Sequence, residues 1–427
     1  MNTSQQQESI AIAENLEKAL RREFESLSPL SKDCCIYRVP PRMRRLNERL
    51  YTPQVVSIGP IHHGREEFKA MEEHKRRYLQ DFLQRTKVNM KEFLALVKDR
   101  EAKLRGRYAE IIELGSKNFV KMILVDAAFI IELFLRLSIY DRLNVGVDRI
   151  FTNPRMISDI APDLLKLENQ FPLFILEDLF NLAKTEMHTN HYEGVSMIGL
   201  TWKFLQPLNN QFLLEQNLVE TNFSKAEHFV DLIRLSLQPP ELKPSENVTP
   251  IEVKTLAILS ATELHQAGVK FEVGSRKNLF DISFKDGIMV IPNLKIIDES
   301  EGLFRNLQVF EILHCNTNYI NDYITFINFL VNTRKDVEFL IHEGVIDNLL
   351  WDGEGVSTLF HNLVKEAKVV SFNFYYSSIV KDLKAYCKHP WHTWKANLKQ
   401  NYFNTPWAAI SIIAAVILLL LTVIIEL

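Results

Sequence analysis

The chain has 427 residues, of which 47% are hydrophobic and 24% are charged, as in a globular protein with a sizeable core. Its formal net charge of −3 gives no electrostatic reason to bind nucleic acid, so we predict no nucleic-acid partner. Only 14 residues are glycine, about half the usual share of roughly 7%, which argues against Gly-rich phosphate loops. Four cysteines are too few for a disulfide framework at this length.

The N-terminal segment, residues 1–30, is polar. Ile10, Leu16 and Leu20 recur among charged residues at helical spacing, so we expect this segment to be partly helical. It lacks the apolar core of a secretory signal peptide.

A basic cluster follows, with five arginines in the twelve residues Arg38–Arg49. Such a cluster can bind phosphate or anionic lipid. The preferred interpretation is a solvated, ion-paired face, and a peripheral lipid-binding module is kept as an alternative.

The stretch VSIGPIHHG, residues 56–64, places two histidines between turn-forming glycines. Neighbours on an extended chain point to opposite faces, so His62 and His63 are poorly placed to chelate one ion. One interpretation is a structural turn whose imidazoles bond within the fold. The alternative is a general base, which requires a carboxylate from elsewhere in the chain.

Helical patterns dominate the next 120 residues. The segment 66–83 is amphipathic, whereas 119–137 is apolar nearly all round and is predicted to lie at the centre of the core. Within that central helix, Glu132 and Arg136 are spaced as an intrahelical ion pair.

Polar residues interrupt two apolar regions: Asp126 in the central helix, and Glu168 with Asn169 just before a helix that begins near Pro172. A buried carboxylate must be paired or hydrogen-bonded. We therefore predict a polar cluster that ties the N-terminal segment to the core through Arg38 or His62. A pocket lined by the same groups is the alternative.

After a linker-like stretch at 238–250 and a helix at 251–267, three alternating runs predict a small antiparallel sheet. Asp286-Gly287 lies between two of them and indicates a hairpin. Helices are then expected at 302–344, 356–367 and 372–388.

The run from Trp407 to Ile425 contains no charged residue in 19 positions. A helix of that length spans roughly 28 Å, which predicts a transmembrane helix at 407–425. Residues 391–406 are rich in aromatic residues and lysine, as is typical of a membrane interface. These features predict a single-pass, tail-anchored protein with the membrane as a partner and a cytosolic body.

The chain resembles a large plant-specific family known as domain of unknown function 247. The matching stretches are IYRVP from residue 36, YTPQVVSIGPIHHG from 51, MEEHK from 71, LVDA from 124, LKLENQFP from 165, ELHQAGVKF from 263 and IPNL from 291. The resemblance implies no established activity, cofactor or catalytic residue, and it favours one folded unit over residues 31–390.

The predicted fold is therefore mainly α, a multi-helix globular body with a small antiparallel β-sheet and a C-terminal transmembrane helix. The predicted function is that of a membrane-anchored plant protein with protein partners, a non-enzymatic interaction, recognition or signalling protein. No catalytic, cofactor-binding or metal-binding residue is assigned, because phosphate-cradle, dinucleotide, metalloprotease and hydrolase motifs are absent. The main alternative is an enzyme that uses His62 or His63 with a buried carboxylate.

Overall fold

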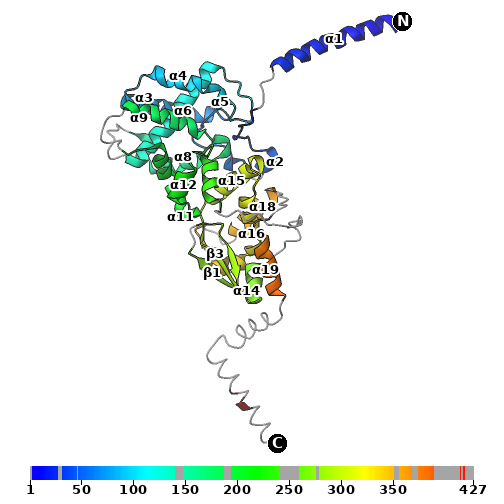
Figure 1. Ribbon diagram of the computed structural model, residues 1–427, viewed down its shortest axis with the longest axis vertical. Helices are drawn as coiled ribbons and strands as arrows, with labels where there is room; N and C mark the ends of the chain where they lie inside the picture. Colours follow the sequence, from blue (N-terminus) through cyan, green and yellow to red (C-terminus); the bar gives the residue numbers. More distant parts are fainter. Residues whose placement is uncertain are drawn as a thin grey trace.

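The computed structural model shows a mainly helical chain with two small sheets (Figure 1). It describes residues 2–26, 31–45, 47–139, 148–186, 194–239, 259–275, 278–350, 355–367, 374–388, and residues 414, 417 and 418.

In the N-terminal half, the regular elements among the described residues are all helices. They are α1 (Asn2–Ser26), α2 (Pro41–Arg44), η1 (Glu48–Leu50), η2 (Glu66–Phe68), α3 (Lys69–Thr86), α4 (Met90–Asp99), α5 (Glu101–Arg105), α6 (Ser116–Ile139), α7 (Arg149–Thr152), α8 (Pro154–Asp163), η4 (Leu167–Asn169), α9 (Leu173–Glu186), α10 (Met197–Leu205), η6 (Gln206–Leu208), α11 (Asn209–Phe212), α12 (Gln216–Asn222) and α13 (Phe229–Leu237).

The C-terminal half combines helices with strands. They are α14 (Ala261–Gln266), β1 (Lys270–Gly274), β2 (Ser283–Lys285), β3 (Ile288–Pro292), β4 (Leu294–Ile296), α15 (Ser300–His314), α16 (Tyr319–Leu330), α17 (Arg334–His342), β5 (Ile346–Asn348), α18 (Gly355–Ala367) and α19 (Ser377–Cys387).

Helix α6 is the centre of the first helical group and packs against α3, α4, α9 and α10. From Phe119 to Leu135 it buries apolar side chains on every face, which confirms the predicted central helix. The predicted pair is also present, because Arg136 Nε donates to Glu132 Oε1 at 3.0 Å.

Helix α15 has the same place in the second group, where it packs against α13, α16 and α18. The two groups share one hydrophobic core, whose buried members run from Val39 to Leu383. Most of the predicted linker, residues 240–250, lies outside the described residues.

The predicted antiparallel sheet requires correction. The Asp286-Gly287 hairpin is confirmed, since β2 and β3 pair antiparallel, but β1 pairs with β3 in parallel and the strand order is β1-β3-β2. The chain leaves this sheet after Pro292, and β4 pairs in parallel with the unpredicted strand β5. Alternation of apolar residues identifies strands but not their partners, which explains the error.

The predicted C-terminal transmembrane helix is not supported, and the tail-anchored fold class, the single-pass localisation and the membrane partner are corrected with it. Within the part of the chain that the structure describes, no helix is both long and apolar enough to cross a membrane. Helix α6 is long, but it carries Asp126, Glu132 and Arg136. The stretch Trp407 to Ile425 lies outside the described residues apart from positions 414, 417 and 418, as does 391–406. The prediction used the length of an apolar run and the composition of the residues before it, and neither shows that the run forms a continuous helix.

The hairpin turn at Gly287 provides a test of how α19 is held on the sheet. Gly287 has φ +81°, and a Cβ there would lie 2.5 Å from Tyr386 Oη on α19. We expect Gly287→Ala to lower the free energy of unfolding by at least about 2 kcal/mol, because backbone strain adds to overpacking. Urea denaturation measures this loss.

Gly64→Ala is the matched control, because Gly64 has φ +82° but its Cβ would meet nothing within 4 Å. This variant should lower the free energy of unfolding by about 1 kcal/mol, because only the backbone strain of a positive φ is added. Equal losses in the two variants would show that the contact with Tyr386 contributes nothing.

Candidate functional site

The segment from Gln54 to His62 is irregular and largely buried, and it is not part of either sheet. Buried backbone N–H groups must find acceptors, and no neighbouring strand supplies them here. Side chains from three other elements do so instead.

Asp163, at the end of α8, accepts hydrogen bonds from the backbone N–H groups of three successive residues. The distances to its carboxylate oxygens are 2.9 Å from Gln54, 2.6 Å from Val55 and 2.9 Å from Val56. Three donors converging on one carboxylate fix the direction of the chain at this point.

Asn169 and Asp126 hold the next residues. Asn169 Oδ1 accepts from Ile58 N at 2.7 Å and its Nδ2 donates to Val56 O at 3.0 Å. Asp126 Oδ2, from α6, accepts from Gly59 N at 2.9 Å.

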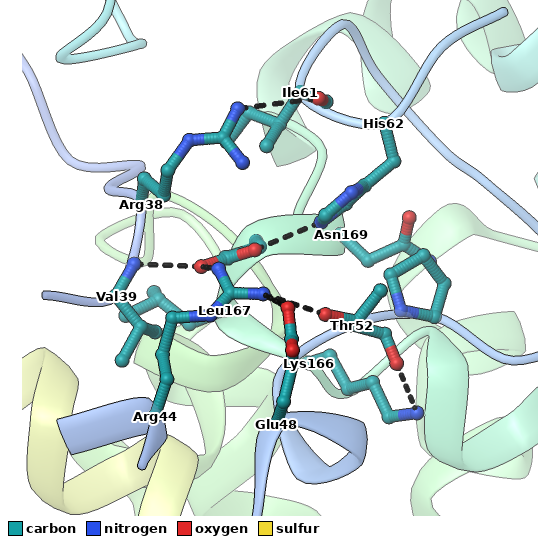
Figure 2. A network of polar contacts seen from close by, with 12 residues as sticks. Arg38, Val39, Arg44, Glu48, Thr52, Ile61, His62, Lys166, Leu167 and Asn169 are labelled. Carbon is teal, nitrogen blue, oxygen red and sulfur yellow. Dashed lines mark hydrogen bonds and ion pairs between the residues drawn. The ribbon is translucent and has the colours of Figure 1, made fainter. Parts of the chain in front are cut away.

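Glu168 completes the set, and its three partners Val39, Arg44 and His62 are labelled in Figure 2. Its Oε1 accepts from Val39 N at 2.8 Å and from Arg44 Nη1 at 2.5 Å, and its Oε2 lies 2.9 Å from His62 Nε2. We call Asp126, Asp163, Glu168 and Asn169 the buried hub, and each is only 1% exposed.

Each carboxylate of the buried hub has its own cation. Lys75 Nζ lies 2.5 Å from Asp126, and Lys166 Nζ lies 2.9 Å from Asp163. Arg44 forms an ion pair with Glu168. A buried anion is costly without such a partner, so these pairs permit three carboxylates to be buried beside one segment of the chain.

Gly59 allows the segment to approach the core closely. It has φ +70°, and a Cβ at this position would lie 2.8 Å from Tyr108 Oη and 3.3 Å from the carbonyl oxygen of Gln170. Both the backbone conformation and the space therefore require glycine.

The contact between His62 and Glu168 is an ionised carboxylate accepting from a neutral imidazole. Burial lowers the pKa of His62 and outweighs the opposing effect of Glu168. Burial alone would raise the pKa of Glu168, but His62, Val39 and Arg44 hold it below its usual value. With Nε2–H donating to Glu168, His62 Nδ1 is left as a buried acceptor with no hydrogen-bond partner.

The structure brings four of the five residues of the predicted polar cluster together: His62 lies on the segment 54–62, and Asp126, Glu168 and Asn169 bond to that segment. His63 does not join them: its side chain is half-buried and its Nδ1 has no hydrogen-bond partner. Among the described residues, no group of three or more His, Cys, Asp or Glu is arranged to hold a metal ion.

Sequence reasoning missed Lys75, Lys166 and Asp163. For Lys75 a signal was available, because the buried positions of α3 are Met71, Lys75, Tyr78, Phe82 and Thr86, the spacing of an apolar face. A lysine on such a face requires a buried anion as its ion-pair partner. Burial alone would lower the pKa of Lys75, but Asp126 and Glu72 raise it, so the ammonium stays charged.

The basic cluster is divided between interior and surface. Arg38, the alternative tie to the polar cluster, pairs instead with Glu110 at 2.6 Å, and Arg44 is committed to Glu168. Arg42, Arg45 and Arg49 are exposed. Three of the five arginines are therefore at the surface.

The fold and the buried hub define a mainly helical protein in which side chains of the core bind the backbone of the segment 54–62. The chain matches the family described as plant protein of unknown function, DUF247, over residues 36–421, and it belongs to that family. The matched range includes the whole buried hub and the segment bound to it.

Two curated relatives, both from Arabidopsis thaliana, are similar along nearly their whole length. UPF0481 protein At3g47200 is 30% identical over 415 residues, which is 92% of this chain and 85% of the relative. Putative UPF0481 protein At3g02645 is 23% identical over 499 residues, covering 95% and 92% of the two chains. No solved structure matches the chain.

Two glutamates pair with the same Arg44, one buried and one exposed, and they allow a matched test of the buried hub. Glu168→Gln leaves Arg44 and the Val39 N–H without their buried anion, so we expect the free energy of unfolding to fall by about 3 to 5 kcal/mol. Glu48 has a side chain that is 69% exposed, so Glu48→Gln should cost less than about 1 kcal/mol. Chemical denaturation of both variants gives the comparison, and similar losses would contradict the role assigned to burial.

The buried imidazole of His62 predicts a loss of stability in weak acid. Its folded-state pKa lies below the usual 6.5, so the unfolded chain binds more protons and stability present above pH 6.5 is lost as the pH falls below it. The depressed pKa of Glu168 acts in a separate window, below pH 4.5. We expect His62→Gln to reduce the fall in unfolding free energy between pH 7.5 and 5.5, by at most about 1.4 kcal/mol per pH unit.

Other buried histidines also lose stability in acid, such as His228, whose pKa is lowered to about 4. They are present in both wild type and His62→Gln, so their contribution cancels when the two pH dependences are subtracted. Urea titrations of wild type and variant at the two pH values measure the effect. Parallel pH profiles would mean that His62 does not titrate as proposed.

Proposed function

We propose that this protein is a non-enzymatic interaction or recognition protein of the plant cell. The observation that carries the proposal is the condition of its best acid–base candidates. Asp126, Glu168 and His62 are at most 1% exposed, and their hydrogen bonds are used to hold the backbone and one another.

The enzyme alternative requires a histidine beside a carboxylate in a site that a substrate can enter. The first condition is present, with 2.9 Å between His62 Nε2 and Glu168 Oε2. The second is not, because both side chains have zero solvent exposure. A general base must also reach the proton it removes, and the free acceptor of this imidazole, His62 Nδ1, is itself buried.

Membership of a plant family of unknown function is compatible with the proposal and assigns no reaction.

Proximity labelling tests the proposal. The full chain, fused to a promiscuous biotin ligase and expressed in plant cells, should enrich a reproducible set of proteins relative to the ligase alone. At least one of these proteins should then bind the purified full chain in stoichiometric amount. Absence of any enriched protein would overturn the proposal.

A second arm addresses catalysis directly through His63, the less buried of the two imidazoles. We expect His63→Gln to leave both the labelled set and the affinity for the purified partner within about twofold of wild type. A variant that still folds and binds its partners, but fails to restore a plant line lacking the gene, would favour the enzyme alternative.

A further inference from the structure

Helix α1 presents an apolar stripe that the rest of the protein does not cover. Ile12, Leu16, Leu20 and Phe24 recur every four residues and are 55%, 59%, 47% and 63% exposed. Residues four apart lie on the same side of a helix, so the four side chains form one continuous ridge. In Figure 1 the helix, drawn in blue, projects away from the body.

Every side chain of α1 whose burial the structure describes is exposed, including Glu14, Lys18 and Arg22. Within the part of the chain that the structure describes, none of these side chains is buried against the body of the protein. Helices of this kind owe most of their stability to packing of the apolar face, so an occupant of the stripe is required.

We propose that the stripe binds the same stripe of a second copy of this chain, with the two α1 helices antiparallel. The pattern is self-complementary about position 18: an antiparallel partner places Ile12 beside Phe24, and Leu16 beside Leu20, on both sides of a two-fold axis. Each large side chain then meets another large apolar side chain.

The charges of α1 select the antiparallel orientation. Residues 2–17 contain three glutamates and no basic residue, a net charge of −3, whereas 18–26 contain three basic residues and two glutamates, a net charge of +1. Antiparallel helices bring the acidic half of each copy to the more basic half of the other, and parallel helices place like halves together. Opposed helix dipoles favour the same orientation.

The regular spacing of four also predicts the geometry. Ridges of residues four apart interdigitate at a crossing angle of about −50°, so the helices should cross at the stripe and not coil around each other over a long distance. A contact of four side chains from each copy is small for a stable dimer, so the association should be reversible and dependent on concentration. This inference does not rest on the proposed function.

Sedimentation equilibrium of the full chain tests the proposal. We expect wild type to show a monomer–dimer equilibrium, and Leu16→Glu/Leu20→Glu to weaken the dimer at least about tenfold. The control is Lys18→Glu, which changes the net charge by the same −2 but lies on the opposite side of the helix. Because it removes charge from the basic half and leaves the stripe intact, it should weaken the dimer clearly less than the double variant. A monomeric wild type at 100 µM or an unaffected double variant would overturn the proposal.

The orientation is tested separately by replacing Phe24 with the photocrosslinker p-benzoylphenylalanine in the full chain. An antiparallel pair should crosslink position 24 to residues near Ile12 of the second copy, which peptide mass spectrometry identifies. Crosslinks from position 24 of one copy to residues near position 24 of the other copy would contradict the antiparallel arrangement. Urea unfolding of each variant should match wild type, since α1 contributes no buried side chain among those described.

Discussion

The fold depends on how the backbone N–H groups of residues 54–59 are satisfied. An extended chain inside a protein normally obtains its acceptors from neighbouring strands. Here the acceptors are the side chains of Asp163, Asn169 and Asp126, which come from α8, η4 and α6. The segment 54–59 is thereby hydrogen-bonded to three helical elements. Because all three bind the same segment, it links their positions.

This solution requires charge balance. Carboxylates are stronger acceptors than carbonyl groups, but burying three of them is favourable only with cations at hydrogen-bond distance. Lys75, Lys166 and Arg44 meet that requirement, and Lys75 also donates to the carbonyl of Ser57 in the same segment. The cations therefore both neutralise the buried hub and bind the segment it holds.

The sequence was informative where one residue type has few physical options. Charges within an apolar helix had to be paired, which predicted the pairing of Asp126, and a glycine next to histidines indicated a turn. Lys166 and Asp163 could not be found in this way, because both lie in a mixed stretch where exposure is the ordinary expectation. Strand partners were also out of reach, since β4 and β5 are joined only through the intervening α15, α16 and α17.

The order of the chain has a consequence for its folding. Gly59 is 67 residues from its acceptor Asp126, His62 is 106 residues from Glu168, and Val39 is 129 residues from Glu168. Contacts between distant residues carry a large loop-closure cost and form late. During synthesis, at about 5–20 residues per second, the segment emerges several seconds before its acceptors do. A nascent chain therefore carries VSIGPIHHG without its native acceptors, its N–H groups bonded to water, until the residues from Asp126 to Asn169 have been made.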